Sequence, residues 1–275
     1  MKITTTLSKV CKFLLCLSLI ESFLLTKESN AFFPRVNEPN QQELKSTSIQ
    51  IGKTSVQLIQ FGRYEEAIKL LRLAVKLNPK EVDLWSTLAE AQMRSKKDYQ
   101  ALSSLDRAMN IKPDEQSLFF RKASIYMNLD DPKKAKIYIK KGLTIDKNNE
   151  RGYFHLGNAE IMLNNYNSAL IAFKKSSEIN SDFWQSINNE GLILYELSNS
   201  TEAISKFKLA LKISNDAEPM LALAVVLFSS DNNSIESVQL AKNALKANPK
   251  YISQEYQANQ LWGKKLQKSA QLLFK

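Results

Sequence analysis

A single histidine, His155, limits most of the catalytic chemistry that the chain could perform. One imidazole cannot supply a histidine-rich metal site, and it could serve only one catalytic centre that needs histidine. Neither cysteine accompanies it, because Cys11 and Cys16 both lie near the N-terminus. The sequence has no glycine-rich phosphate loop, no nucleophile elbow and no HExxH motif. We therefore expect His155 to be a packed structural residue and the chain not to be an enzyme. We expect no catalytic residue, metal, cofactor or small-molecule substrate.

Small side chains recur along the chain at intervals of 34 residues. Two antiparallel helices approach closely only where small side chains separate their backbones. The spacing therefore predicts repeated helical hairpins whose helices cross at these positions. One series is Ala67, Ala101, Ala135, Ala169, Ala203 and Ser237. The second is Ala74, Ala108, Gly142, Ser176, Ala210 and Ala244, and the third is Ser55, Ala89, Ala123, Gly157, Gly191 and Val225.

This pattern resembles the tetratricopeptide repeat family. The second repeat carries the resemblance most fully, in Trp85, Leu88, Ala89, Tyr99, Ala101, Ala108 and Pro113. The resemblance implies an all-α fold, a right-handed α-solenoid of six helix-turn-helix repeats. The predicted repeats span 48–81, 82–115, 116–149, 150–183, 184–217 and 218–251.

Both ends of such a stack need a cover, because one repeat cannot bury its apolar face alone. At the N-terminal end, residues 32–47 are predicted to form a linker and the start of the first helix. Asn40 and Glu43 are predicted to form a capping box there, and the helix should run towards Phe61. At the C-terminal end, residues 252–275 have an amphipathic pattern that predicts one capping helix. A helix that lies on a membrane surface is the alternative.

Residues 1–31 have the pattern of an export signal. Three lysines precede a short apolar run at 13–25, and Ala31 offers a small residue for cleavage. We expect the mature chain to begin near Phe32 and to lie in a periplasm or a thylakoid lumen. The alternative is that residues 1–25 remain as a membrane anchor.

The resemblance also predicts a binding surface. In tetratricopeptide proteins the first helix of each repeat lines an inner groove. Aromatic and methionine side chains mixed with amides suit a bound peptide or helix. The predicted partner-binding residues are Glu90, Met93, Arg94, Phe120, Met127, Asn128, Phe154, Asn158, Met162, Asn188 and Tyr195.

A second surface is predicted on the second helices, where basic residues recur at one repeat position. The chain has a formal net charge of +10, although a lysine excess is also what an AT-rich genome produces. These residues form either a docking strip for an acidic protein or anionic lipid, or a solvated face without a partner. This basic ridge comprises Arg72, Lys140, Lys174, Lys208 and Lys242.

Residues 31–40, 58–79 and 260–263 also resemble those of cyanobacterial and plastid tetratricopeptide proteins, which commonly assist thylakoid or photosystem assembly. The resemblance implies an exported, non-catalytic scaffold or assembly factor that binds a protein or peptide. The alternative is a membrane-anchored adaptor that contacts anionic lipid or an acidic protein through the basic ridge. Nucleic acid is not an expected partner, because the chain has an export signal and no aromatic and basic platform.

Overall fold

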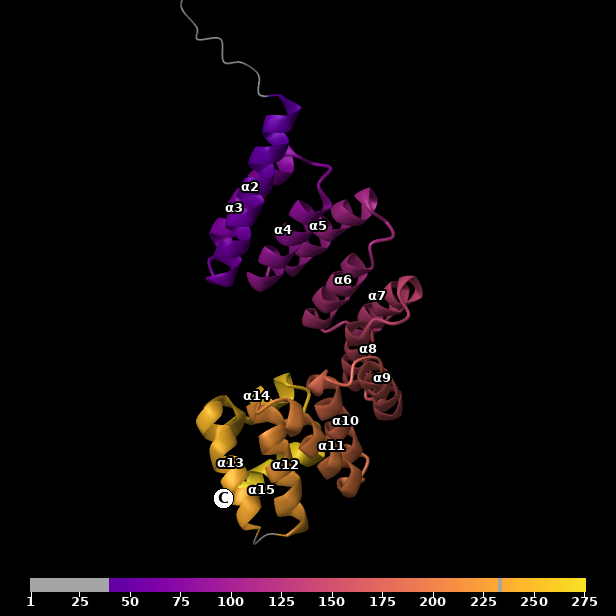
Figure 1. The fold of residues 1–275 in the computed structure, drawn as a ribbon, viewed down its shortest axis with the longest axis vertical. Coiled ribbons are helices and arrows are strands. Elements are labelled where there is room, and N and C mark those ends of the chain that lie inside the picture. Colours follow the sequence, from indigo (N-terminus) through magenta and orange to yellow (C-terminus); the bar gives the residue numbers. More distant parts are fainter. Residues whose placement is uncertain (1–39, 232–233) are drawn as a thin grey trace, which may run out of the picture. The chain divides into compact units, whose positions relative to one another are not determined.

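The computed structural model describes residues 40–231 and 234–275, and every element among them is helical. Helical hairpins follow one another along this part of the chain (Figure 1). Their first helices are α2 (Gln41–Gln60), α4 (Val82–Arg94), α6 (Gln116–Asn128), α8 (Glu150–Met162), α10 (Trp184–Glu196) and α12 (Ala217–Ser230). Their second helices are α3 (Tyr64–Leu77), α5 (Asp98–Ile111), α7 (Pro132–Ile145), α9 (Tyr166–Ile179), α11 (Ser200–Ile213) and α13 (Ile235–Ala247). The predicted all-α class is confirmed.

Most of the N-terminal predictions concern residues that the structure does not describe. The predicted signal segment 1–31, the alternative anchor 1–25 and residues 32–39 of the linker lie outside the described residues. Helix α2 begins at Gln41 and ends at Gln60, so the prediction of a long first helix that runs towards Phe61 is confirmed. Among the described helices, none is long and apolar enough to cross a membrane.

The two helices of a hairpin pack through the small residues that recur in the sequence. Ala101 and Ala169, on two of the second helices, are completely buried. Gly191 on α10 shows why a small residue is needed, because a Cβ atom built there would lie 2.7 Å from the ring of Phe207 on α11. That separation is shorter than van der Waals contact, so a larger side chain would push the helices apart. The predicted crossing positions are therefore confirmed at these residues.

The turns inside the hairpins repeat with the same spacing. Lys96, Asp130, Asn164 and Ser198 all have a positive φ, between 56° and 67°, and Gly62 has a φ of 74° in the first hairpin. In the second hairpin the Lys97 N–H donates to the Gln92 carbonyl at 2.8 Å, and the Lys96 N–H donates to the Met93 carbonyl at 2.9 Å. These two bonds satisfy carbonyl groups that the end of α4 would leave without partners. The first five hairpins thus reverse direction through the same short turn.

The C-terminal segment differs from its prediction. Residues 252–275 do not form one helix. Instead, the 3₁₀ turn η1 (Pro249–Ile252) leads into α14 (Gln254–Asn259), and α15 (Lys264–Leu273) follows after a turn. Leu261 has a φ of 63° in that turn, and Gly263 precedes α15. The prediction of a single continuous helix is wrong because this turn redirects the chain.

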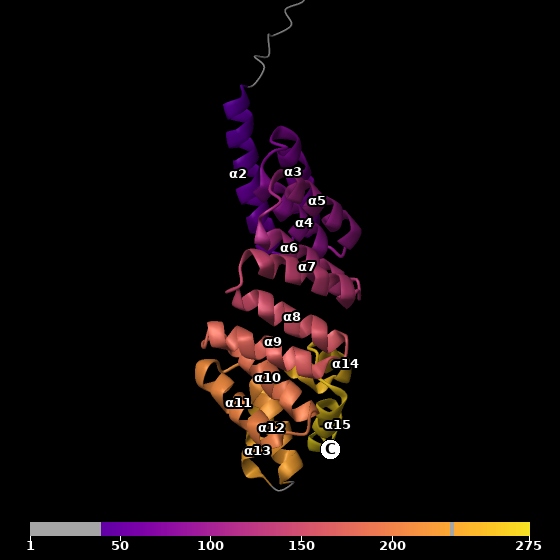
Figure 2. The same ribbon diagram turned by 90° about the vertical axis from the view of Figure 1, so that its right-hand side faces the viewer.

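The turn brings α15 against α10 and α12, two of the first helices. Figure 2 shows α14 and α15 on one side of α10 and α12, with α11 on the other side. Leu266 and Ala270 of α15 are completely buried there. Helix α12 is apolar around most of its circumference, and such a helix requires burial on all sides. Helix α15 therefore covers apolar surface, as a cap does, but this surface belongs to first helices.

Candidate binding face

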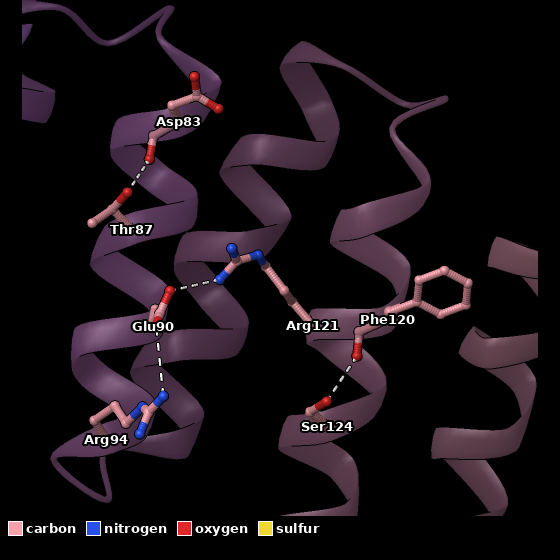
Figure 3. Close-up of polar contacts among 7 residues, drawn as sticks. All are labelled: Asp83, Thr87, Glu90, Arg94, Phe120, Arg121 and Ser124. Carbon is pink, nitrogen blue, oxygen red and sulfur yellow. Dashed lines mark hydrogen bonds and ion pairs between the residues drawn. The ribbon is translucent and has the colours of Figure 1, made fainter. Parts of the chain in front are cut away.

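One side of the first helices carries the polar side chains of repeats 2 to 4. We call this side the inner face, and on α4 it comprises Asp83, Thr87, Glu90 and Arg94 (Figure 3). A spacing of three and four residues places these four side chains along one side of a helix. The same positions 34 residues later are Ser117, Arg121, Ser124 and Asn128 on α6, and Arg151, His155, Asn158 and Met162 on α8.

A carboxylate connects α4 and α6 across the inner face. A guanidinium nitrogen of Arg121 donates to Glu90 at 2.9 Å, and a guanidinium nitrogen of Arg94 lies 3.8 Å from the other oxygen of Glu90. Figure 3 shows Glu90 between the two arginines. The side chains of Arg94 and Arg121 are 55% and 44% exposed, so these ion pairs add little stability. They remain open to solvent and could exchange partners.

The structure thus brings two predicted binding residues, Glu90 and Arg94, to one site together with Arg121. Arg121 is not among the binding residues predicted from the sequence, although the repeat spacing indicates its position. It lies 34 residues after Thr87 and 34 before His155, so the repeat register alone would place it on the inner face. Asn128, another predicted residue, is exposed at the end of α6.

The predicted aromatic anchors pack inside the repeats. The ring of Phe120 lies against Gly142 of α7 and Gly152 of α8, so it fills the space between α6 and these two helices. Figure 3 shows it pointing away from Glu90 and Arg121. The centre of the Phe154 ring lies 5.8 Å from that of Phe173 and 5.2 Å from that of Phe183, and both pairs of rings are tilted by 57°. Both side chains are half-buried packing residues, because they precede the inner-face positions by one residue and the helix turns about 100° per residue.

The predicted methionines are also half-buried. Met93 packs against the cluster of the second hairpin, and Met127 against that of the third. Both follow their helix's third inner-face position by three residues, so they contribute to packing and do not hold an inner-face position. Met162 is half-buried at the end of α8, at an inner-face position. Of these three methionines, only Met162 therefore lies on the inner face as defined here.

Tyr195 and Asn188, two further predicted binding residues, are buried. Tyr195 is 3% exposed because α15 covers it, and its hydroxyl lies 2.8 Å from Ser269 of α15. The Lys265 ammonium lies 4.4 Å from the centre of the Tyr195 ring, within the range of a cation–π contact. Asn188, on the same helix α10, is completely buried. The prediction that they face an open groove is wrong in this structure, because the chain's own C-terminal helix occupies the place of a partner at Tyr195.

The end of α10 fixes the start of α15. The Glu196 carboxylate accepts hydrogen bonds from the backbone N–H groups of Lys265, at 3.2 Å, and Leu266, at 2.9 Å. These N–H groups have no partner within their own helix, and the helix dipole favours a negative charge beside them. Glu196 holds an inner-face position, so the inner face of repeat 5 binds a helix terminus.

A cavity of about 300 Å³ lies between α6 and α8 on the inner face. Arg121, Arg151 and His155 line it, together with the half-buried Phe120. Burial lowers the pKa of His155, and the nearby charge of Arg151 lowers it further. His155 lies between the rings of Phe120 and Phe154, at 6.5 and 5.9 Å. It is therefore a packed, neutral imidazole at the edge of a cationic cavity.

The basic ridge lies on exposed surface. All five of its side chains belong to second helices and are exposed. Arg72 donates to Gln100 at 3.0 Å. The described residues contain no cluster of three or more histidine, cysteine, aspartate or glutamate residues that could hold a metal ion.

Comparisons with known proteins agree with this architecture. Residues 58–121 match a family model described as tetratricopeptide repeat, and residues 117–149 and 150–183 match a second model with that description. No curated protein sequence matches the chain. Among solved structures, the chain is similar to pilF of Pseudomonas aeruginosa, with a TM-score of 0.65 and 18% identity over 80% of this chain and 98% of that one.

Two other solved structures are similar in fold. One is PilW, described as a widely conserved type IV pilus biogenesis factor, with a TM-score of 0.62, 18% identity, and coverage of 80% of this chain and 97% of that one. The other is YrrB, described as a TPR protein with an unusual peptide-binding site, with a TM-score of 0.50, 17% identity, and coverage of 66% and 94%. The family matches show that residues 58–183 consist of tetratricopeptide repeats, and the helical hairpins that precede and follow them have the same architecture.

Proposed function

We propose that the chain is a non-catalytic scaffold that binds a partner polypeptide along the inner face of α4, α6 and α8. The observation that carries this proposal is the half-exposed set of charged and hydrogen-bonding side chains around Glu90 and Arg121. Helix α15 packs on α10 and α12, which leaves the inner face of α4 and α6 free of it. The likeness to YrrB, a TPR protein described as having a peptide-binding site, supports the same choice.

The partner is expected to be an extended peptide or a helix with acidic groups. Arg94, Arg121 and Arg151 lie at inner-face positions of three consecutive first helices. Asp83 and Glu90 offset two of these charges, and Glu90 already contacts two of the arginines. A partner carboxylate could take over a guanidinium group, because an exposed ion pair is weak and easily exchanged.

Affinity capture from native membranes, followed by mass spectrometry, tests this function. The variant Arg94→Ala/Arg121→Ala/Arg151→Ala should keep its circular dichroism and lose the captured partner. The matched control Lys140→Ala/Lys174→Ala/Lys208→Ala removes the same number of positive charges from the basic ridge and should keep the partner. Loss of the partner from the ridge variant alone would contradict the proposal.

A second candidate function rests on the exposure of the whole basic ridge. In this alternative the chain is an adaptor, anchored by residues 1–25, that contacts anionic lipid or an acidic protein. Each basic residue near an anionic surface contributes about 1 kcal/mol. The ridge variant should then lose salt-sensitive binding to phosphatidylserine vesicles. A wild-type chain that ignores such vesicles at low salt would remove this candidate.

The place of action is part of the proposal. The export pattern of residues 1–31 supports a scaffold that works in a periplasm or a thylakoid lumen, as an assembly factor for a membrane complex. N-terminal sequencing of the native protein tests this. A chain that begins near Phe32 agrees with export, whereas an intact Met1 in a membrane fraction favours the anchored adaptor.

A further inference from the structure

A second cavity, of about 420 Å³, lies where the repeats meet the C-terminal segment. Its walls come from α8 and α10, from the start of α12, and from η1, α14 and the turn after α14. The charged side chains that line it are Asp216 and Glu218, and none of its lining residues is a lysine or arginine. This is unusual in a chain with 38 basic and 28 acidic residues.

Glu218, which is partly exposed, differs from the two buried carboxylates among the described residues. Glu160 and Glu190 are buried, and each lies close to a lysine ammonium, Lys136 at 2.7 Å and Lys206 at 2.6 Å. Glu218 instead accepts a hydrogen bond from the neutral indole of Trp262 at 2.9 Å. Burial is the largest influence on its carboxyl group and raises its pKa to about 7, and the negative charge of Asp216 acts in the same direction. A carboxylate that is partly removed from water and has only neutral donors, Trp262 and Tyr251, is costly to ionise, so a cation beside it would be stabilised.

The remaining walls also suit a cation. The rings of Trp184, Tyr251 and Tyr256 line the cavity, and the faces of such rings attract ammonium and guanidinium groups. The amides of Asn158 and Asn189 lie at inner-face positions in the wall, 3.2 Å apart. Amides of this kind can bind the backbone of an extended peptide. The cavity therefore adjoins the inner face that the proposed partner would follow.

We propose that this cavity binds the ammonium or guanidinium group of a lysine or arginine side chain of the partner polypeptide. Asp216 and Glu218 are the counter-charges, and the aromatic rings form the walls. This inference rests on the proposed function, because the side chain belongs to the polypeptide bound along the inner face. It adds a basic anchor at the end of repeat 4 to the acidic groups expected over α4 and α6.

Nuclear magnetic resonance titration of the purified full chain with two small probes tests the site directly. The probes are N-acetyl-arginine methylamide and its neutral isostere N-acetyl-citrulline methylamide. The indole N–H signals of Trp184 and Trp262 report on the cavity, and that of Trp85, which donates to the Pro79 carbonyl, serves as an internal reference. The arginine probe should shift the first two signals saturably, with an affinity at least about tenfold above that of the citrulline probe.

Charge-neutral variants sharpen the test. Glu218→Gln keeps the acceptor for Trp262 and should weaken the arginine probe at least about tenfold, and Asp216→Asn provides a second neutral change if Glu218→Gln disturbs folding. The matched control Glu236→Gln alters an exposed acid in the first turn of α13 and should change nothing. Affinity should also rise from pH 6 to pH 8, because the cation favours ionised Glu218. The other titratable groups that line the cavity are Asp216, Tyr251 and Tyr256.

Equal binding of the citrulline and arginine probes, or no saturable shift with arginine at its solubility limit, would overturn the inference. Failure of the probes together with a captured partner that depends on Arg94, Arg121 and Arg151 would leave the proposed function intact. Probe binding without such a partner would support the cation site and reject the proposed use of the inner face.

Discussion

The inner face changes character between repeats 2 to 4 and repeats 5 and 6. Its two central positions hold Thr87 and Glu90 on α4, and His155 and Asn158 on α8, whereas the equivalent pair on α12 is Leu223 and Val226. The polar half is partly exposed, and the apolar half is buried under α15. One fold therefore provides two surfaces from the same repeat positions.

The comparison shows how the occupant of an inner face can be read from its residues. Helix α15 is a helix bound to first helices, held by an apolar contact through Leu266 and by the Glu196 carboxylate at its start. A surface that is permanently covered in this way can be apolar without risk of aggregation. A binding surface that is exposed to water in the free protein must be polar, which explains the charges around Glu90.

The largest expected effect on stability concerns the apolar inner face of repeats 5 and 6, which α15 covers and which we call the covered half. Leu266→Ala leaves a cavity beneath α15 and should lower the free energy of unfolding by about 2–5 kcal/mol. Arg121→Ala on the open half should lower it by no more than about 0.5 kcal/mol, because the side chain is exposed. Chemical denaturation measures both. Leu272→Ala, on the exposed side of α15, is the matched control for Leu266.

The covered half should also respond to pH through Glu218. Its pKa is raised to about 7 in the folded chain from an ordinary value of 4.5, so ionisation opposes folding. The contribution of protonated Glu218 to the free energy of unfolding is complete below about pH 4.5. It is lost as the pH rises through 7, which lowers the free energy of unfolding by up to about 3 kcal/mol. His155, whose pKa is lowered, acts in the opposite sense.

Glu218→Gln isolates the effect because His155 is present in both proteins. The wild type and this variant should melt at similar temperatures near pH 5, and the wild type should melt lower near pH 8.5. Parallel melting curves across this range would show that folding does not raise the pKa of Glu218.

A smaller effect is expected from one hydroxyl group beneath α15. Tyr195→Phe removes the hydrogen bond that the Tyr195 hydroxyl donates to Ser229 and the hydrogen bond between this hydroxyl and Ser269. The free energy of unfolding should fall by about 1 kcal/mol, and hydrogen exchange should quicken in α15 more than in α4. Tyr99→Phe, at a side chain that is 78% exposed, is the control and should have no such effect. Equal exchange in both helices would contradict the docked position of α15.

The smallest expected change is stabilising. Lys96 has a φ of 59°, which favours glycine, and Gly62 holds the equivalent position in the first hairpin. Lys96→Gly should therefore raise stability by about 0.5–1 kcal/mol, less the entropy cost of glycine in the unfolded chain. Thermal melting measures this. A destabilised variant would mean that the lysine side chain has a role that its backbone geometry does not show.

Much of the fold could be predicted because its determinants are local and periodic. The small residues at 34-residue intervals mark the helix crossings, and their burial at Ala101 and Ala169 agrees with this. The docking of α15 on α10 and α12 could not be predicted in this way, because an amphipathic pattern shows that a helix covers apolar surface but not which surface. The apolar run 220–228 in α12 was a signal, since such a helix needs burial on every side.

The binding face was predicted less well than the fold. Phe120 and Phe154 were chosen for their chemistry, since aromatic side chains often anchor interfaces. The repeat register would have chosen Arg121 and His155, one residue later, because Thr87 holds the equivalent position on α4. In a repeat protein, the position within the repeat is therefore a better guide to a face than the residue type.

Site-specific photo-crosslinking in living cells tests the central claim most directly. A photoreactive amino acid replaces Asn128, which is exposed on the inner face of α6, or Lys174, which is exposed on the basic ridge. The account predicts a covalent adduct with a partner polypeptide from position 128 and none from position 174. An adduct from position 174 alone would contradict it, because the partner would then bind the second helices.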